Sequence, residues 1–408
     1  MDRDQLDRLK ALPPLASKNR QFIPCKICGD RAFVFDVVDF NKCCAEPECY
    51  PYGMCGVPVV FFRCTVCRFL FTNFFDDWTQ EDFARFVYND DYINVDGEYA
   101  GPRPDREAEA IARTLAGHND LKILDYGSGS GLFADRLRSR GFQHVVAYDP
   151  FARPDHPGGS YDVITCFEVL EHSTSPHATL SDIARLLKPD GLVIFSTGIQ
   201  PSSINEVRGN WWYVAPRNGH ASIFTFDALA RLGQSHGFSL HIGSGNHAFV
   251  RPDSSAKTLA IQSGLGRSLR IFELAAPDSG PMPAGQSQMW HDVESNGAAT
   301  YRWTRESEIE WRLQSAFLRD CELSITVPIV MEVQPGFADN CILRIGRQKV
   351  RLARDSDRLI GSISIDQPTE AIVKLVTPLP LRPNDLRPVA DNRPLGLAIA
   401  VRNKGSGT

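Results

Sequence analysis

Three glycines at alternate positions constrain the fold of this chain more than any other feature. In residues 121–132, which read LKILDYGSGSGL, an apolar stretch ends at Asp125 and the glycines follow it. They are Gly127, Gly129 and Gly131. Residues 132–140 can then form a helix, which Gly141 ends. A strand, a glycine turn and a helix in this order present backbone N–H groups to a ligand, and a Cβ in the turn would hold that ligand away.

The spacing of the glycines indicates the kind of ligand. A dinucleotide-binding turn follows the pattern GxGxxG, and the position of its third glycine is occupied here by Leu132. The observed pattern, D-x-G-x-G-x-G, resembles the first motif of class I S-adenosylmethionine-dependent methyltransferases. The resemblance implies that Asp125 and the three glycines contact S-adenosylmethionine.

A second apolar strand is predicted at residues 144–148 (HVVAY), directly before Asp149. An acidic side chain in this place can accept hydrogen bonds from both hydroxyls of a ribose, as in dinucleotide-binding folds. Only 11 residues separate Asp149 from Tyr161, where the next apolar stretch begins. A typical class I enzyme fits a helix and a third strand into this interval. We therefore expect the third strand to be missing or vestigial, and the adenine to be contacted by Phe151 or Phe167.

Residues 161–172 (YDVITCFEVLEH) carry the most specific resemblance. They resemble the fourth-strand motif of the methyltransferases that include ubiquinone-type and sugar O-methyltransferases. An amphipathic helix at 176–188 and a strand at 192–197 (LVIFST) follow in the order of that family. The resemblance covers residues 121–197 and implies a Rossmann-like α/β core, with Phe167 and Glu168 among the cofactor-binding residues. His172 is a candidate for the catalytic base, because histidine can accept a proton near neutral pH.

Eight of the 11 cysteines lie between residues 25 and 67. In an intracellular chain such clustering indicates metal binding rather than disulfides. Two CxxC pairs can place four thiolates on one zinc ion, in a closed and therefore structural site. These pairs are Cys25 with Cys28, and Cys64 with Cys67. The cysteines between the pairs are interpreted as loop cysteines, with a second ion as the alternative: Cys43, Cys44, Cys49 and Cys55.

An aromatic segment, residues 210–225 (NWWYVAPRNGHASIFT), follows the fifth predicted strand. Loops beyond the carboxyl ends of strands bind the ligands of open α/β sheets. Aromatic faces beside an arginine suit a polyhydroxylated ring. We therefore expect the methyl acceptor to be held by Trp211, Trp212, Tyr213 and Arg217. His220 is a second candidate for the base, and the alternative is that the tryptophans pack in the core or at a domain interface.

The composition changes after residue 251. A helix is predicted at 264–275 and a linker rich in proline, glycine and serine at 277–287. Short strands at intervals of about ten residues then predict an all-β sandwich. Its end, near residues 382–403, resembles modules attached to bacterial polysaccharide-modifying enzymes. The predicted domains are a zinc-binding domain with a turn-rich linker (1–100, the linker at 88–104), the methyltransferase core (101–252), a helix and linker (253–294), and the sandwich, with glycan binding as its candidate role (295–408).

Composition narrows the function classes. The formal net charge of −5 argues against a nucleic-acid partner. No apolar stretch approaches the roughly 20 residues of a transmembrane helix, and the N-terminus lacks the apolar core of a signal peptide. A cytoplasmic protein with a small-molecule or glycan substrate is expected.

The aromatic segment, together with the resemblance, favours O-methylation of a sugar or polysaccharide hydroxyl. Two alternatives stay open at this point. One is C-methylation of a nucleotide-linked deoxy-ketosugar, an activity that also couples an N-terminal zinc domain to this core. The other is a glycan-binding scaffold that holds the cofactor without turnover.

Overall fold

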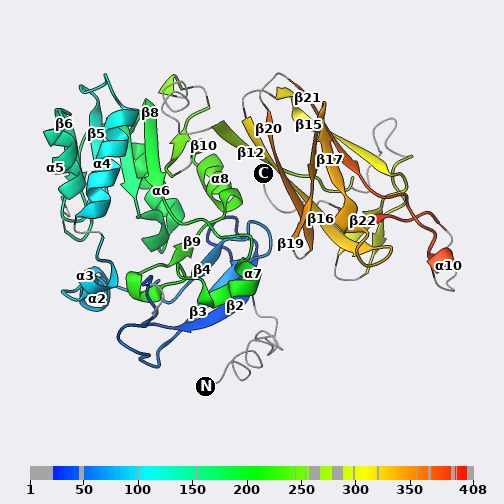
Figure 1. The fold of residues 1–408 in the computed structure, drawn as a ribbon, viewed down its shortest axis with the longest axis horizontal. Helices are drawn as coiled ribbons and strands as arrows, with labels where there is room; N and C mark the ends of the chain where they lie inside the picture. Colours follow the sequence, from blue (N-terminus) through cyan, green and yellow to red (C-terminus); the bar gives the residue numbers. More distant parts are fainter. Residues whose placement is uncertain are drawn as a thin grey trace. The chain divides into compact units, whose positions relative to one another are not determined.

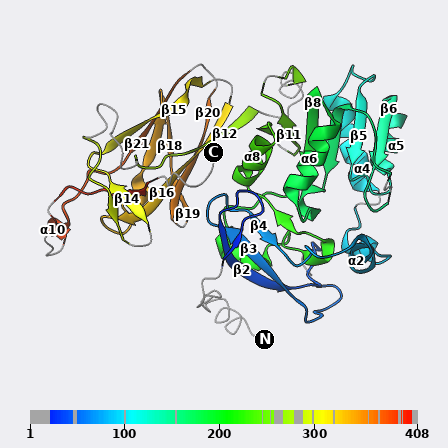
Figure 2. The same ribbon diagram turned by 180° about the vertical axis from the view of Figure 1, so that it is seen from behind.

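The computed structural model describes residues 22–45, 50–98, 101–152, 155–243, 245–252, 254–256, 267–277, 288–296, 299–318, 321–355, 357–365, 369–386, 391 and 393–401. The chain divides into two compact units, Met1–Gly266 and Arg267–Thr408. Figures 1 and 2 show their elements from opposite sides. None of the described helices is both long and apolar enough to cross a membrane.

The central sheet of the first unit has the strand order β10-β11-β8-β7-β5-β6. Its strands are β5 (Lys122–Tyr126), β6 (His144–Tyr148), β7 (Tyr161–Phe167), β8 (Leu187–Ser196), β10 (Ser239–Ile242) and β11 (His247–Val250). The strands β8, β7, β5 and β6 run parallel, whereas β10 and β11 are antiparallel additions. Among the described residues between Asp149 and Tyr161 there is no further strand, and β6 is the edge of the sheet, as the short interval predicts.

Helices cover both faces of this sheet. Those concerned are α4 (Pro102–Thr114), α5 (Leu132–Ser139), α6 (Pro176–Leu186) and α8 (Phe226–Ser235). The helices α4 and α5 contact each other and share a hydrophobic core with alternate residues of the strands, among them Ile123 and Ile194. On the opposite face, Gly233 of α8 lies against the ring of Phe249, where a Cβ would be 2.7 Å from a ring carbon. Alternation along each strand therefore gives the sheet two buried faces.

A second sheet precedes the central one in the chain and is completed by a strand that follows it. Its order is β1-β2-β3-β4-β9. The bounds are Phe22–Pro24 (β1), Arg31–Asp39 (β2), Pro58–Cys64 (β3), Leu70–Thr72 (β4) and Ser222–Ile223 (β9). Leu70 pairs with Ile223, and Figure 1 shows the blue strand β4 beside the green strand β9. The N-terminal sheet is thus built partly from the aromatic segment.

Short helices link the two sheets: α2 (Gln80–Phe86), α3 (Tyr92–Val95) and α7 (Ile204–Val207). The cap of α2 is strong, because Thr79 accepts from the backbone N–H of Asp82 while the Asp82 side chain accepts from that of Thr79. The linker predicted at 88–104 is wrong in part, since it contains α3 and the start of α4. Pro102 at the first position of α4 supplies a fixed φ that suits a helix start.

The second unit is built of strands. One sheet has the order β13-β14-β22-β16-β12, and β20 pairs with β16 and β19 with β20. The other has the order β15-β21-β17-β18. Bounds are Arg267–Glu273 (β12), Glu294–Ser295 (β13), Thr300–Trp303 (β14), Glu308–Leu318 (β15), Cys321–Glu332 (β16), Ile342–Ile345 (β17), Gln348–Arg351 (β18), Ala353–Asp355 (β19), Arg358–Ile365 (β20), Thr369–Val376 (β21) and Leu397–Ala400 (β22), with a helical turn α10 at Pro383–Leu386.

One hydrophobic core joins these two sheets, with Leu323 and Ile363 from the first and Leu343 and Val373 from the second. The helix predicted at 264–275 is wrong where it can be compared, because residues 267–273 form β12 and residues 264–266 lie outside the described part. Residues 268–273 pair in parallel with residues 321–326 of β16. Tertiary pairing thus decides the conformation of a segment whose local pattern also allows a helix.

Candidate active site

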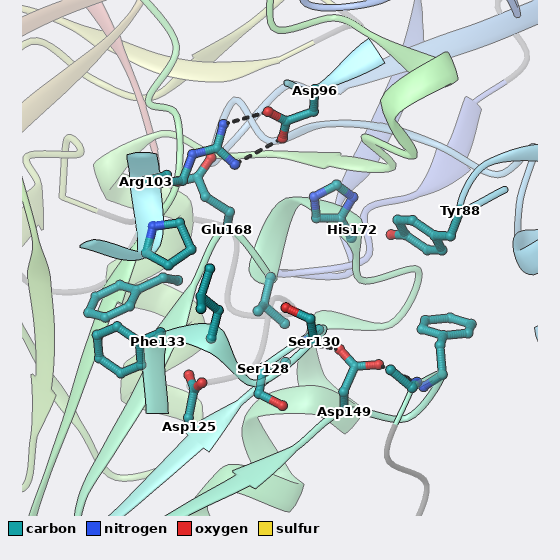
Figure 3. A pocket seen from close by; sticks show the side chains of 18 of the residues that line it. Tyr88, Asp96, Arg103, Asp125, Ser128, Ser130, Phe133, Asp149, Glu168 and His172 are labelled. Atoms are coloured by element: carbon teal, nitrogen blue, oxygen red, sulfur yellow. Dashed lines mark hydrogen bonds and ion pairs between the residues drawn. The ribbon is translucent and has the colours of Figure 1, made fainter. Parts of the chain in front are cut away.

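A cavity of about 440 Å³ lies at the carboxyl ends of β5, β6 and β7. Open α/β sheets bind their ligands at this edge, outside the carboxyl ends of the strands. The cavity is lined by the glycine turn, by the segments after β6 and β7, and by residues of the region from Tyr88 to Glu107. Figure 3 shows the labelled side chains around it.

The glycine turn has a conformation that side chains disfavour. Gly127, Gly129 and Gly131 have φ values of +80°, +51° and +84°. A Cβ on Gly127 would lie 2.3 Å from a methyl carbon of Val169, so a larger residue would collide with the segment after β7. Gly127 and Gly129 line the cavity, whereas Gly131 caps the N-terminus of α5 and does not line it. Two of the three glycines predicted to bind the cofactor therefore line the cavity, and Gly131 shapes the turn instead.

Asp149 is fixed at the cavity wall by backbone donors. Its Oδ2 accepts from the N–H of Gly129 at 2.9 Å, and its Oδ1 accepts from the N–H groups of Phe151 and Ala152, both at 2.8 Å. The carboxylate thus joins the glycine turn to the segment after β6 (Figure 3). This arrangement holds a negative charge at the edge of the cavity with its direction set.

Asp125 is a buried carboxyl at the floor of the cavity. It is 4% exposed, its Oδ1 accepts from the hydroxyl of Thr165 at 3.3 Å, and its Oδ2 is buried without a partner. Burial raises its pKa to about 7, and the charge of Asp149 adds to the rise. A buried oxygen without a donor is costly in a folded protein, and a ligand that donates to it would relieve the cost.

Glu168 has an unusual backbone conformation, with a φ of +51° on a residue that is not glycine. The Oε1 of Glu168 accepts from the hydroxyl of Ser196 at 2.8 Å. The backbone N–H of Glu168 donates to the Oγ of the same Ser196 at 3.2 Å. These contacts with β8 hold the side chain at the cavity wall, where Figure 3 places it between Arg103 and His172. Strained residues of this kind concentrate at functional sites.

The arginine of the cavity is already paired. Arg103 donates two hydrogen bonds of 2.9 Å to the two oxygens of Asp96, as Figure 3 shows. A bidentate pair of this geometry is strong and fixes the plane of the guanidinium. Among the described residues that line the cavity, carboxylates therefore outnumber cations.

His172 lines the cavity and His220 lies behind it. The two rings are 5.0 Å apart between centroids, and His220 does not line the cavity. Burial lowers the pKa of His172 to about 4 and that of His220 to about 3, so both rings are neutral at pH 7. The Nδ1 of His220 donates to the carbonyl of Tyr213 at 2.8 Å, whereas the Nδ1 of His172 is buried without a partner.

Glu171 completes a small buried cluster. It is fully buried and accepts at 2.6 Å from the hydroxyl of Tyr213, and its other oxygen has no partner. One ligand atom each of Glu171, His172 and His220 lie within 4.8 Å of one another. Burial raises the pKa of Glu171 well above its usual value, so the group favours its neutral form.

The four residues expected to hold the acceptor do not line this cavity. Trp211 packs against the core of the N-terminal sheet, and Trp212 is 39% exposed. Tyr213 is buried and its hydroxyl accepts from the N–H of Gly198 at 2.8 Å. Arg217 is 5% exposed and donates to the carbonyl of Val87 at 2.9 Å. The pairing of β9 with β4 draws the segment into the protein, and Arg217 acts by holding the residues before Asn89.

Several cavity residues were not among the predicted site residues. They are Tyr88, Asn89, Tyr92, Asp96, Pro104, Glu107, Ser128, Ser130, Leu132, Phe133, Pro150, Ala152 and Val169. Tyr88, with Tyr92 and Phe151, forms an aromatic group whose ring centroids are 5.2 Å from that of Tyr88 in both cases. The density of aromatic and acidic residues between 88 and 98 is the sequence signal that distinguishes this stretch from an ordinary linker.

The four cysteines of the two CxxC pairs come together. Sulfur to sulfur, Cys25 is 3.6 Å from Cys67, Cys28 is 3.5 Å from Cys64, and Cys28 is 3.6 Å from Cys67. A disulfide needs about 2.05 Å, whereas a tetrahedral zinc ion with Zn–S bonds of about 2.3 Å places its sulfurs about 3.8 Å apart. Cys43, Cys44 and Cys55 are not in disulfides and do not belong to this group, and Cys49 lies outside the described residues.

The cysteine cluster is tied to the residues behind the cavity. His177 of α6 donates to the carbonyl of Ile27 at 2.8 Å, and the hydroxyl of Thr225 donates to the carbonyl of Cys67 at 2.8 Å. Between them, the N–H of Ala221 donates to the carbonyl of Glu171 at 2.8 Å. The segment from Ala221 to Thr225 therefore contacts Glu171 at one end and the second cysteine knuckle at the other.

Comparisons with known proteins agree with this geometry. Residues 99–241 match the family described as "Methyltransferase domain". Curated relatives include the ubiquinone biosynthesis O-methyltransferases of Alkalilimnicola ehrlichii (34% identical, 21% of this chain and 45% of the relative) and Neisseria meningitidis serogroup A (31%, 20% and 48%). The chain thus spans less than half the length of these relatives.

Solved structures with a similar region include two methyltransferases. Magnesium protoporphyrin IX methyltransferase from Synechocystis, with bound S-adenosylhomocysteine, is 18% identical and covers 43% of this chain and 96% of that one, with a TM-score of 0.29. An O-methyltransferase family protein from Burkholderia thailandensis is 14% identical and covers 44% and 64%, with a TM-score of 0.33. The family match and the motifs place a methyltransferase domain at residues 99–241, on a sheet whose glycine turn borders the cavity.

Proposed function

We propose that this chain transfers the methyl group of S-adenosylmethionine to a hydroxyl of a sugar or polysaccharide. The observation that carries the proposal is the composition of one cavity, in which the glycine turn, Asp149 and His172 meet at the carboxyl ends of the parallel strands. The two curated relatives named above are O-methyltransferases, which supports oxygen as the atom that receives the methyl group.

The cavity residues fit the cofactor in charge and shape. The close approach that Gly127 and Gly129 allow suits a ligand lying on the backbone, and Asp149 can accept from the two ribose hydroxyls. The orphaned oxygen of Asp125 needs a donor. When bound, S-adenosylmethionine supplies a methyl group on a positively charged sulfur, and a cavity rich in carboxylates favours such a charge.

His172 is the base in this proposal. A hydroxyl is a weak nucleophile until its proton is being removed, and the neutral ring of His172 can accept that proton. Methyl transfer otherwise depends on holding the two reactants in line and close together. His220 acts through contact with His172, because it touches the ring of His172 and does not line the cavity.

The charges of the cavity favour a neutral acceptor over a nucleotide-linked one. A diphosphate needs arginine or lysine partners, and Arg103, the described cation at the cavity, is occupied by Asp96. Arg217 is buried and directed to the carbonyl of Val87. A saccharide hydroxyl without a phosphate is therefore favoured over a nucleotide-linked keto-sugar.

We also propose roles for the N-terminal cysteine cluster and for the second unit. Cys25, Cys28, Cys64 and Cys67 fit one zinc ion, and a four-thiolate site leaves no open position for chemistry. Such an ion would hold the fold of the N-terminal sheet. We also propose that the second unit is a β-sandwich that binds glycans, which its two sheets with a shared core support as an architecture.

The test is release of S-adenosylhomocysteine from S-adenosylmethionine with a panel of acceptors. The panel contains neutral oligosaccharides, the corresponding polysaccharides and nucleotide-linked keto-sugars. Turnover with a neutral saccharide, and an O-methyl group in the product by mass spectrometry, is expected. Turnover with the keto-sugar alone would overturn the acceptor class, and binding of the cofactor without turnover on any acceptor would support a scaffold.

A further inference from the structure

Three carboxyl groups form one wall of the cavity: Glu107 of α4, Asp125 at the end of β5, and Glu168 after β7. The other two act on the charge of Glu107, since Glu168 and Asp125 both raise its pKa. Within the described chain, the nearby guanidinium of Arg103 is held by Asp96. Arg103 and Arg106 oppose this rise, so the wall is a carboxyl-rich cluster that shares the guanidinium of Arg103 with Asp96.

A second observation shows that one carboxyl oxygen of the wall lacks a hydrogen-bond partner. Asp125 is 4% exposed, and its Oδ2 has no hydrogen-bond partner although it borders the cavity. Native proteins rarely leave a buried carboxyl oxygen without a partner unless a ligand supplies one. Like-charged carboxyls in a shared site cannot all ionise, so protons are retained there.

The retained protons lie in the range of neutral pH. Burial, together with Glu168, raises the pKa of Glu107 to about 8, and burial raises that of Asp125 to about 7. A positively charged ligand would lower both values, because an opposite charge favours the ionised form. Binding of a cation at the wall should therefore release a proton from one of these carboxyl groups.

We propose that Glu107, Asp125 and Glu168 are the counter-ion site for the sulfonium of S-adenosylmethionine, and that binding of this cofactor expels a proton from the wall. The inference rests on the proposed function and names the residues that distinguish cofactor from product. The proton leaves a carboxyl group for the solvent, and the carboxylate that remains faces the sulfonium. S-adenosylhomocysteine has a neutral sulfur, so the wall keeps its proton and holds the product more weakly.

Other ionisable groups face the wall and must be accounted for. They are Tyr88, Tyr92, Asp96, Arg103, Arg106, Arg138, Asp149 and His172. Burial raises the pKa values of Tyr88 and Tyr92 above their usual value near 10, and it lowers that of His172 to about 4. These three groups do not change charge between pH 6 and 7.5, so a proton released in that interval comes from the carboxyl wall.

The decisive experiment is calorimetric titration of the full chain with S-adenosylmethionine and with S-adenosylhomocysteine at pH 6.5. Each titration is run in two buffers with different heats of ionisation, and the difference in heat gives the number of protons released. The amino and carboxyl groups are the same in both ligands, so the sulfonium is the difference. We expect S-adenosylmethionine to release more protons, and its affinity to rise by up to about tenfold per pH unit for each proton fully released.

Equal proton release by the two ligands, or none by S-adenosylmethionine, would overturn the counter-ion site. That result differs from the two ways in which the proposed function can fail: neither ligand binds at any pH, or both bind but no saccharide acceptor is methylated. The wild-type comparison requires no substitution, so it decides the question even where a variant does not fold.

A matched pair of variants assigns the proton. Glu107→Gln should reduce the proton release and flatten the pH dependence for S-adenosylmethionine, while the affinity for S-adenosylhomocysteine stays within about twofold of wild type. Glu109→Gln alters an exposed carboxylate on the same helix, ion-paired to Arg113, and should change neither quantity. Unchanged proton release in Glu107→Gln, with normal binding of both ligands, would remove Glu107 from the site.

Discussion

Burial determines the charge of the histidines at this site. His220 is packed against both His172 and Tyr213. The pKa values of His172 and His220 fall to about 4 and about 3, because a charged ring would lose its hydration. Because the pKa of His172 is about 4, its ring stays neutral from alkaline pH down to about pH 4. A base at this position is ready at neutral pH without any deprotonation step.

Replacing this base tests its role directly. His172→Ala should lower kcat by roughly 10²–10⁴-fold, the usual contribution of a general base, and should leave the Kd for S-adenosylmethionine unchanged. For the wild type, the kcat should stay level between pH 8 and 5.5, because the ring does not take up a proton in that range. His118→Ala, an exposed histidine in the turn after α4, is the control. A loss of cofactor affinity equal to the loss of kcat would make His172 a structural residue.

Asp149 supports a second prediction at this scale. Asp149→Ala removes the acceptor for the ribose hydroxyls, and hydrogen bonds to charged groups contribute about 1.5–3 kcal/mol, so calorimetry should show S-adenosylmethionine binding one to two orders of magnitude more weakly. The change also frees the N–H groups of Gly129, Phe151 and Ala152. Asp149→Asn retains one acceptor oxygen, so its affinity for S-adenosylmethionine should lie between those of the wild type and Asp149→Ala. An unchanged affinity in Asp149→Ala would place the ribose elsewhere.

At the scale of elements, the N-terminal sheet and the methyltransferase domain share the segment that contains His220. Thr72 donates its N–H to the carbonyl of Ala221, and the hydroxyl of Ser222 donates to the carbonyl of Ser173. The segment is therefore held from both sides, by β4 and by the turn that presents His172. Disrupting the cysteine cluster should therefore affect His172, the proposed base, although the cluster does not touch the cofactor site.

Cys64→Ser tests this connection. The variant should lose the zinc ion, and the N-terminal sheet should be destabilised because metal binding contributes folding free energy in such sites. Hydrogen exchange at residues 213–223 should accelerate and kcat should fall, while the affinity for S-adenosylmethionine is largely kept. Metal analysis gives the first result, and Cys55→Ser, an exposed cysteine of the same region, is the control. Full zinc content in Cys64→Ser would contradict the assignment of the ligands.

Local signals predicted the elements of the cofactor side well. The strand at 144–148 has the predicted bounds, and the helix predicted at 132–140 is found at Leu132–Ser139, because apolar strands and glycine stops act within a few residues. The destination of the aromatic segment could not be predicted in this way. Its placement depends on pairing between Leu70 and Ile223, far apart in sequence. The position of Glu107 in the cavity wall was not predicted for the same reason. Only the fold brings α4 to the end of β5.

At the scale of the whole molecule, the chain consists of two units with separate cores. All residues described as lining the cavity belong to the first unit. A compact unit with its own core can usually fold alone. The cofactor site should therefore not require the second unit.

A chain ending at residue 266 tests this independence. It should bind S-adenosylmethionine with an affinity within about twofold of the full chain, as measured by calorimetry. If the second unit binds glycans, the shortened chain should methylate a short oligosaccharide at the normal rate and a polysaccharide at a higher KM. An insoluble product or a lost cofactor site would mean that the two units depend on each other for folding.

The pairing of β4 with β9 also has a consequence for the order of events during synthesis. Leu70 leaves the ribosome about 150 residues before its partner Ile223, which at 5–20 residues per second is a delay of roughly 8–30 s. During this interval the edge of β4 has no partner strand, and buried aromatic residues such as Phe69 and Phe224 have not met. The nascent N-terminal sheet therefore exposes an unpaired edge strand until residues 222–223 emerge and pair with it.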